Sequence, residues 1–312
     1  MRLSALGEPG LLRELERRGL ARGLGAEGAV LEDGFVITQD VLLEGEHFRL
    51  GWTSWRDLGY KAAAVNLSDL AALGAEPEGL LISLGLPSAT ELDRVVELYE
   101  GLNEPGVPVL GGDTAAAERV ILAVTALGRS ERVPGRTGAR RGDLLVVTGP
   151  LGGSAAGLHA LRESLGGFDE LVEMHSRPPL RLREGRDLAR VAHAVVDLSD
   201  GIAADAARIA ERSAVRLVVE VERLPLAPRL ADVGALPFWT LGEDYELLAA
   251  LPEEDANQSG YAIVGWCEEG SGVEIRLNGE PLDVAGWDSF ATPRTGASAA
   301  RRPRSGSSSG RR

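Results

Sequence analysis

The stretch YKAAAVNLSDLAALGA, residues 60–75, decides how the first half of this chain folds. Its apolar residues recur at helical spacing, and Asn66 and Asp69 stand three positions apart, so a helix places both on one face. The tripeptide Leu-Ser-Asp returns in VAHAVVDLSDGIAAD, residues 191–205, again beside a nearly all-apolar run. Burying a carboxylate is unfavourable unless a cation or hydrogen bonds compensate for the lost water. Either the tripeptide recurs by chance, or both carboxylates serve one cation-rich site.

The second Leu-Ser-Asp has a different predicted setting. An apolar run typical of a buried strand ends at Asp197 and Asp200, and the helical pattern IAADAARIA (202–210) follows. Ligands of α/β proteins bind where strands pass into helices. We therefore expect the helical Asp69 and these strand-end carboxylates to face one site.

The composition favours a soluble protein of the cytoplasm. A length of 312 residues predicts two domains, and 44% hydrophobic with 26% charged residues is typical of a globular protein. No apolar run approaches the ~18 residues of a membrane span. Glu8, Glu14 and Glu16 lie among the leucines of the first twenty residues, which is unlike a signal peptide. The single cysteine, Cys267, excludes an internal disulfide and a multi-cysteine zinc site.

The charge distribution limits which molecules the chain is expected to bind. The net charge is −14, although residues 294–312 hold six arginines and no acid. The preceding 293 residues carry 27 basic and 47 acidic residues, so we expect them to bind neither nucleic acid nor an anionic membrane. Phosphorylated metabolites remain compatible if metal ions neutralise them first. The Ser/Gly/Arg-rich segment 294–312 is predicted to be a disordered basic tail.

Two enzyme classes are excluded by missing motifs. Lys61 is the only lysine and follows no glycine-rich loop, so the chain is not a P-loop NTPase. No Gly-x-Ser-x-Gly segment stands between a predicted strand and a predicted helix, which excludes the common serine hydrolase pattern.

Periodicity and turn residues predict a mixed α/β chain of two domains. We expect an N-terminal sheet domain over residues 1–135 and a C-terminal α/β domain over 136–293, with the boundary in the Gly/Arg/Pro-rich segment 130–143. The predicted helices of the first domain are 8–19, 55–73 and 90–102. Its predicted strands are 35–38, 79–87, 107–114 (passing into a loop) and 119–129. In the second domain we predict strand-then-helix units at 143–161 and 192–210, and strands at 216–222, 245–251, 261–266 and 273–278.

Acidic residues at the ends of apolar segments are candidate ligands of hard divalent cations such as Mg²⁺, which prefer carboxylate oxygens. The set is Glu27, Asp40, Asp69, Asp113, Asp197 and Asp200. Each of these residues also has an interpretation that involves no metal. For example, Asp113 could be a turn residue, Asp200 could form an Asx-turn, and Asp69 could lie on a solvated helix face.

Three other sequence features each have a functional and a purely structural interpretation. The glycine loop TGPLGGSAAG (148–157) either cradles a phosphate or serves the backbone only. His47 is either a substrate contact or an ordinary polar residue. Trp287 and Phe290 either stack on a flat ring or belong to the core.

Seven motifs, in order, resemble the thiamine-monophosphate kinase family, a branch of the superfamily of aminoimidazole ribonucleotide synthetase and selenophosphate synthetase. They are YKAAAVNLSDLAALGA, VLGGDT, RTGARRGD, TGPLGGSAAGL, VDLSDGIAAD, LGEDYELL and GWDSFATP. The GEDYEL segment and the GWDSF ending point to the thiamine branch.

The resemblance implies the two-domain aminoimidazole ribonucleotide synthetase-like fold, a homodimer paired through the N-terminal domain, and ATP-dependent phosphorylation of thiamine monophosphate with several Mg²⁺ ions. The implied metal ligands are Glu27, Thr38, Gln39, Asp40, Asp69, Asp113, Asp197 and Asp200. The implied ATP contacts are Gly112, Asp113, Arg136 and Ser199, and the implied thiamine contacts are His47, Glu243 and Trp287. Asp40, Asp69, Asp113 and Asp200 are the implied catalytic carboxylates.

The chain departs from the family pattern at two places. GLGAEGA (23–29) stands where the family has Gly-Asp-Asp, so Glu27 replaces one aspartate and Ala26 offers no ligand in place of the other. Gln39 replaces a residue with a hydroxyl group. The change alters the geometry of the metal site if the side chain at this position coordinates the metal, and has little effect if the backbone carbonyl does. Two alternatives follow: a sister ATP-dependent enzyme acting on another small molecule, or a degenerate protein that binds nucleotide or thiamine phosphate without turnover.

Overall fold

The computed structural model describes residues 3–21, 23, 26–234 and 237–284. Helix α1 (Leu3–Arg17) belongs to a unit separate from the body, which begins at Gly23. It is interrupted at Gly7, whose φ of 68° is not helical, and the predicted helix at 8–19 is confirmed with an end two residues earlier. Trp287, Phe290 and the predicted tail lie outside the described residues.

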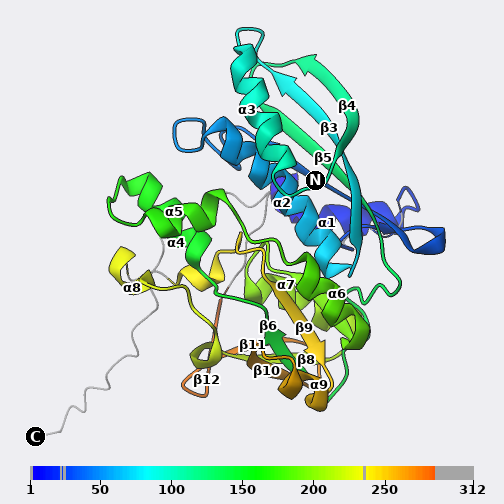
Figure 1. Ribbon diagram of the computed structural model, residues 1–312. Coiled ribbons are helices and arrows are strands. Elements are labelled where there is room, and N and C mark those ends of the chain that lie inside the picture. The colour runs from blue at the N-terminus through cyan, green and yellow to red at the C-terminus, as the bar shows by residue number, and fades with distance from the viewer. Residues whose placement is uncertain (1–2, 22, 24–25, 235–236, 285–312) are drawn as a thin grey trace, which may run out of the picture. The chain divides into compact units, whose positions relative to one another are not determined.

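The first half of the body is built on a five-stranded sheet, with strand order β1-β2-β5-β3-β4. Figure 1 shows β5, β3 and β4 of this sheet. Its neighbours pair antiparallel except β3 and β4, which are parallel. The strands are β1 (Ala29–Val30), β2 (Phe35–Leu43), β3 (Glu76–Leu86), β4 (Val109–Ala116) and β5 (Ile121–Arg129).

Two predicted strands of this sheet are too short. β2 does not end at Thr38 but continues through Asp40 to Leu43, because its pairing with β5 continues residue by residue over the whole length. β4 does not become a loop at Gly111; it remains paired with β3 as far as Ala116. Glycine and aspartate favour turns locally, and the extended partner strands override that preference.

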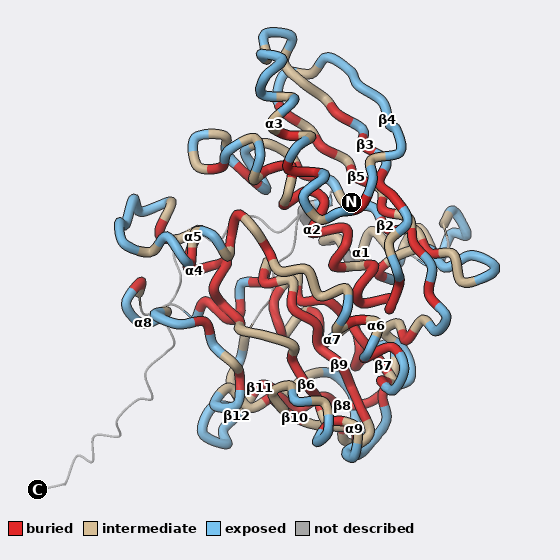
Figure 2. Tube along the Cα trace, viewed as in Figure 1, coloured by how far each residue is buried: buried red, intermediate tan, exposed pale blue. Residues whose placement is uncertain are grey.

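Helix α2 (Trp55–Ala72) is the central element of the body. Ser54 caps its first turn by accepting a hydrogen bond from the Asp57 N–H. It packs against β2, β3, β5 and α3 (Leu92–Asn103) of the first half, and against α6 (Leu182–Val191) and β7 (Ala194–Asp197) of the second half. Because it is covered from both halves, α2 is buried along most of its length (Figure 2).

The second half is built on a seven-stranded sheet of order β12-β11-β8-β10-β6-β9-β7. Its strands, besides β7, are β6 (Leu144–Val147), β8 (Arg216–Glu220), β9 (Leu247–Leu251), β10 (Ala262–Glu268), β11 (Gly272–Leu277) and β12 (Glu280–Leu282). Its helices, besides α6, are α4 (Gly153–Glu163), α5 (Asp169–Ser176), α7 (Ile202–Ser213), α8 (Leu230–Val233) and α9 (Glu253–Gln258). Short 3₁₀ turns occupy Glu32–Gly34, Val221–Arg223 and Phe238–Thr240.

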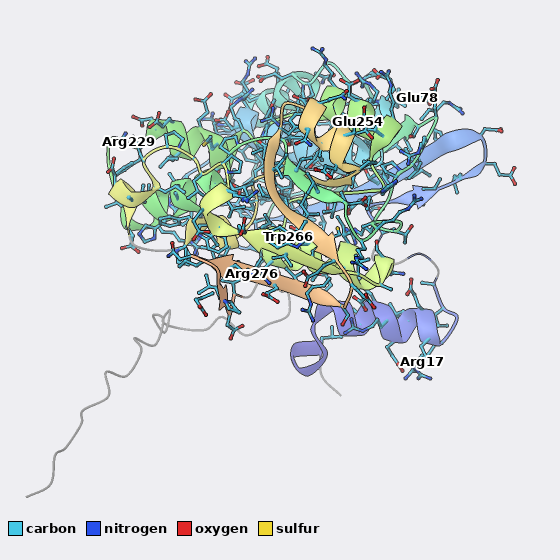
Figure 3. The ribbon with its side chains drawn as sticks, turned by 90° about the horizontal axis from the view of Figure 1, so that it is seen from below. Arg17, Glu78, Arg229, Glu254, Trp266 and Arg276 are labelled. Atoms are coloured by element: carbon cyan, nitrogen blue, oxygen red, sulfur yellow. The ribbon has the colours of Figure 1, made fainter. Side chains whose placement is uncertain are left out.

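The predicted strands of this half are confirmed, and its buried layer is apolar on both faces: all five residues of β9 are buried. On this sheet, Arg276 of β11 lies over the ring of Trp266 of β10, 5.5 Å from the ring centre (Figure 3). Among the described helices, none is both long and apolar enough to span a bilayer.

The contact between α2 and α3 depends on glycine. A Cβ at Gly59 would lie 2.0 Å from the Leu98 carbonyl oxygen, and one at Gly101 would lie 1.9 Å from the Arg56 carbonyl oxygen. Neither oxygen belongs to a flexible side chain, so the two helices would have to separate to admit a methyl group.

We therefore expect Gly59→Ala to destabilise the protein by about 1–3 kcal/mol, measured as a lower midpoint of urea unfolding. Gly166→Ala is the matched control, because no atom lies within 4 Å of the Cβ it would add. Equal midpoints for the two variants would contradict the close approach of the helices.

Candidate functional site

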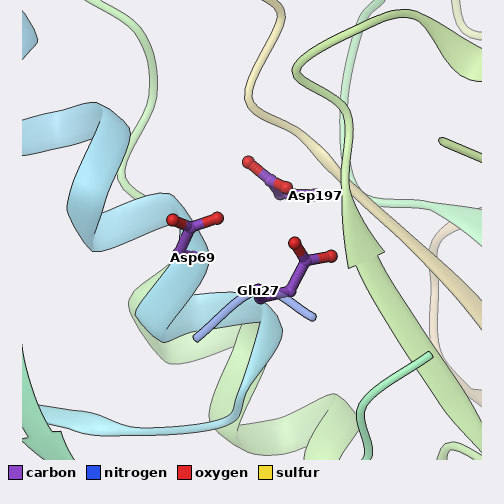
Figure 4. A group of neighbouring side chains, drawn as sticks. All are labelled: Glu27, Asp69 and Asp197. Carbon is purple, nitrogen blue, oxygen red and sulfur yellow. The ribbon is translucent and has the colours of Figure 1, made fainter. Parts of the chain in front are cut away.

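Three carboxylates from distant parts of the chain converge between the two halves of the body. Glu27 lies just before β1, Asp69 on the last turns of α2, and Asp197 at the end of β7. One carboxylate oxygen of each lies within 4.8 Å of the other two, and the three side chains point toward one another (Figure 4). Clustered carboxylate oxygens of this kind are donors that divalent cations prefer.

The two Leu-Ser-Asp motifs meet directly. The Ser68 hydroxyl of the first motif donates a hydrogen bond of 2.9 Å to Asp197 Oδ2, which immediately precedes the second. Both residues are buried. The predicted approach of the helical and the strand-end carboxylates is therefore seen for Asp69 and Asp197.

The electrostatics of the cluster favour bound cations. Burial raises the pKa of Asp69 well above its usual range, and the charges of Asp40, Asp197 and Glu27 raise it further. Burial and Glu27 raise the pKa of Asp197 to about 8, although Ser68 and Arg136 act in the opposite direction. Protons or metal ions must compensate for such crowded carboxylates.

Asp40, on strand β2, lies near enough to the three carboxylates for its charge to act on Asp69 and Asp197. The Asn66 side chain accepts a 2.9 Å hydrogen bond from the Asp40 N–H, and the Thr38 hydroxyl donates a 3.1 Å bond to the Asn66 carbonyl oxygen. Asn66 thereby ties β2 to α2, a role that sequence reasoning missed although it placed Asn66 and Asp69 on one face. Along β2, Thr38 is buried and Gln39 is exposed, so the Gln39 side chain points to the opposite face. Any ligand from Gln39 must then be its backbone carbonyl.

Two arginines hold the acidic residues. Arg136 forms a two-pronged ion pair with Glu27, with Nε 2.7 Å from Oε1. On α7, Arg208 pairs with Asp200 and, at 2.7 Å, with Asp205, whose other oxygen accepts the Asp200 N–H. Sequence reasoning missed Asp205 and Arg208; their spacing of three on the helical pattern after the second motif was the available signal.

Gly112 and Asp113 do not join this cluster. They lie on β4, an exposed edge strand. The strand pairing can be followed across the sheet from β2 to β4. Asp40 of β2 is opposite Val124 of β5, which is opposite Ile82 of β3, and Ile82 is opposite Gly112 of β4. Three inter-strand spacings separate Asp40 from Gly112 by about 14 Å.

A second polar group surrounds Glu243. Glu243 Oε1 lies 3.4 Å from Lys61 Nζ, and Oε2 lies 3.3 Å from His175 Nδ1. Burial acts to raise the pKa of Glu243, but Lys61, His175 and His47 outweigh it and the pKa is lowered. His47 and Glu243, both implied as thiamine contacts, are thus near enough to interact.

Backbone contacts join this group to the second Leu-Ser-Asp. The Glu243 N–H donates a 2.8 Å hydrogen bond to the carbonyl oxygen of Ser199. A Cβ at Gly201 would lie 2.3 Å from the Thr240 carbonyl oxygen, and one at Gly242 would lie 2.4 Å from that of Ser199. These glycines let the two loops pack backbone to backbone.

The glycine loop 148–157 has a structural role in this state. Its Gly152 and Ser154 N–H groups donate to Asp244, at 2.8 and 3.4 Å. Burial raises the pKa of Asp244 to about 7 despite these bonds. Because a carboxylate of the chain itself occupies these donors, the interpretation of the loop as a phosphate cradle is not supported.

Comparison with known proteins agrees with this arrangement. Residues 25–130 match the family model "AIR synthase related protein, N-terminal domain", and residues 140–276 match the corresponding C-terminal domain. The thiamine-monophosphate kinase of Aquifex aeolicus is 36% identical, and the alignment covers 93% of this chain and all of the relative. That of Salmonella typhimurium is also 36% identical, over 87% of this chain and 92% of the relative. The chain belongs to the thiamine-monophosphate kinase family.

Solved structures support the family fold. One described as AaThiL complexed with AMPPCP and TMP has a TM-score of 0.86 and 34% identity, and covers 93% of this chain and 99% of that one. HypE, a hydrogenase maturation protein, shares the fold alone, at 20% identity and a TM-score of 0.67. The expected two-domain, mixed α/β fold of the aminoimidazole ribonucleotide synthetase type is confirmed. The domain limits at 135 and 293 stay predictions.

The raised pKa values of Asp69 and Asp197 predict how stability depends on pH and on metal. The folded chain retains protons that the unfolded chain releases near its ordinary carboxyl pKa of 3.8, so without metal the stability falls as the pH rises toward about 8. Mg²⁺ binds the ionised form, so it should raise the melting temperature more near pH 8 than near pH 5.

Thermal unfolding with EDTA or with Mg²⁺ at both pH values measures this effect. Asp197→Asn should reduce both the pH slope and the gain from Mg²⁺, whereas Asp187→Asn, at an exposed position on α6, should reduce neither. A gain from Mg²⁺ that is equal at both pH values would contradict the assignment.

Proposed function

We propose that this protein transfers the γ-phosphoryl group of ATP to thiamine monophosphate, giving thiamine diphosphate and ADP. A terminal phosphate oxygen of thiamine monophosphate attacks the γ-phosphorus, and the bond from that phosphorus to the β-phosphate oxygen breaks. Family membership supports the activity, and so does the related structure complexed with AMPPCP and TMP. The observation that carries the proposal is the convergence of Glu27, Asp69 and Asp197 from both halves of the chain.

The residues fit a site for Mg²⁺. Three carboxylate oxygens within 4.8 Å of one another supply the hard donors this ion requires, and the raised pKa values of Asp69 and Asp197 reflect charge that a cation would neutralise. The proposed ligands are Glu27, Thr38, Asp40, Asp69, Asp197 and Asp200, with Gln39 through its backbone. Bound Mg²⁺ would offset the charge of the phosphates.

The remaining assignments concern the two substrates. The proposed ATP contacts are Arg136, Ser199 and the β4 residues Gly112 and Asp113. Asp113 lies three strands away from Asp40, too far to bind the same ion as Asp40. Arg136 and Arg208 orient the carboxylates that they pair with. His47 and Glu243, with Trp287, are proposed to bind the thiamine moiety. Catalysis then rests on positioning and charge stabilisation, without a phospho-enzyme.

The activity is tested by following thiamine diphosphate and ADP together, from Mg-ATP and thiamine monophosphate. We expect equimolar appearance of both, abolished by EDTA. Asp40→Asn, Asp69→Asn and Asp200→Asn should each lower kcat by about 100-fold or more, because each removes charge that positions the phosphates. Asp187→Asn, on the surface, is the control.

The outcomes separate the alternatives. ADP without thiamine diphosphate, in the presence of another metabolite, would indicate a sister enzyme of the superfamily. Binding of ATP or thiamine monophosphate without any ADP would indicate a degenerate binding protein, as Ala26 and Gln39 suggest. Near-normal rates in all three aspartate variants would refute the catalytic cluster.

The homodimer is also a proposal, supported by the uncovered face of the first sheet. Val41 and Leu81 are 52% and 39% exposed on the face opposite α2. Pairing of two such faces would bury them. Val41→Glu with Leu81→Glu should convert a dimer to a monomer in sedimentation velocity, whereas Leu277→Glu, at an exposed apolar position on β11, should not. A wild-type monomer would refute the dimer.

The proposed location is the cytoplasm. The co-substrate ATP is a metabolite of that compartment. Cys267 is the only cysteine of the chain, so it has no partner for an internal disulfide, and burial raises the pKa of its thiol to about 12.

A further inference from the structure

The single lysine of the chain lies in an unusual place. Lys61, on α2, is only 2% exposed, and its Nζ makes no hydrogen bond of good geometry with any described residue. Its ion pair is with Glu243 Oε1, at 3.4 Å. A buried ammonium group is unfavourable unless a carboxylate compensates it, so the position calls for an explanation beyond packing.

Glu243 is held on both of its oxygens. His175 Nδ1 faces Oε2 at 3.3 Å and lies 3.0 Å from the Ser154 hydroxyl. Burial, with a smaller effect of Lys61, lowers the pKa of His175 to about 4, so the ring is neutral near pH 7. Of the two ion-pair partners that Glu243 has among the described residues, Lys61 is therefore the one that supplies positive charge.

The backbone of Glu243 is equally constrained. Its φ of 59° lies in the left-handed region, which non-glycine residues adopt only when their surroundings require it. Its N–H is bonded to Ser199, in the second Leu-Ser-Asp motif. The Glu243 side chain nevertheless remains 27% exposed, so a ligand can still reach the carboxylate.

We propose that Lys61 is a positioning residue that holds Glu243 as an ionised, acceptor-only carboxylate for the cationic and hydrogen-bond-donating part of thiamine monophosphate. This inference rests on the proposed function. An ionised carboxylate accepts hydrogen bonds and donates none, so it selects ligand groups that donate or carry positive charge. Thiamine offers both, in its thiazolium ring and its exocyclic amine.

The inference predicts an effect confined to one substrate. Lys61→Met keeps a long side chain of similar volume and removes the charge, so Glu243 loses the partner that orients it. The KM for thiamine monophosphate should rise by about tenfold or more, whereas the KM for ATP should stay within about twofold. Leu58→Met, a buried change one turn earlier on α2, controls for altered packing.

A double-mutant cycle separates positioning from a general structural role. If Lys61 acts through Glu243, Lys61→Met combined with Glu243→Gln should have a KM for thiamine monophosphate no higher than that of Glu243→Gln alone. Additive effects of the two substitutions, or equal increases in both KM values for Lys61→Met, would overturn the proposal.

A measurement on the wild-type protein covers the case in which Lys61→Met fails to fold. Labelling with ¹⁵N-lysine gives one side-chain Nζ resonance, because Lys61 is the only lysine. Thiamine monophosphate should shift this resonance, and a non-hydrolysable ATP analogue alone should not. An unchanged resonance at saturating thiamine monophosphate would overturn the proposal.

Calorimetry distinguishes failure of this inference from failure of the proposed function. If the wild-type protein makes thiamine diphosphate and Lys61→Met binds thiamine monophosphate equally well, the Lys61 assignment alone is wrong. If the wild-type protein binds thiamine monophosphate without turnover and Lys61→Met weakens binding about tenfold, the assignment stands and the kinase activity is wrong. If the wild-type protein does not bind thiamine monophosphate, both are wrong.

Discussion

The mutual repulsion of Glu27, Asp69 and Asp197 is the constraint on which the rest of the structure depends. These carboxylates lie within 4.8 Å of one another in a largely buried place, and their charge must be balanced locally. The Ser68 hydroxyl and the Arg136 guanidinium supply part of that balance from the protein. The remainder falls to protons or to cations, which makes the cluster suited to binding metal-complexed phosphates.

Helix α2 makes this convergence possible. It carries Asn66, Ser68 and Asp69 on its last turns, and it packs against the strands of the first sheet and against β7 of the second. The same helix carries Lys61 two turns earlier, where it reaches Glu243. A single buried helix thus orients the proposed metal ligands and the proposed substrate carboxylate, which couples phosphate chemistry to recognition of the organic part of the substrate.

Positive charge in this site is used mainly to hold acidic side chains. Arg136 pairs with Glu27, Arg208 with Asp200 and Asp205, and Lys61 with Glu243. Each pair fixes the orientation of its carboxylate, which a rigid binding site requires. An acidic protein with one lysine can thereby bind two anionic substrates, provided that metal ions accompany the phosphates.

By itself, the sequence determined the local elements and the family. Periodicity placed α2 and the strands of the second half, and the ordered motifs identified the thiamine-monophosphate kinase family, because these signals lie within short stretches of chain. Only the tertiary structure decided which carboxylates meet. It separated Asp113 from Asp40, turned the Gln39 side chain to the opposite face of β2, placed Asp244 on the N–H groups of the glycine loop, and brought Lys61 to Glu243. Such pairings depend on strand register and helix packing between residues far apart in the sequence, which no local pattern encodes.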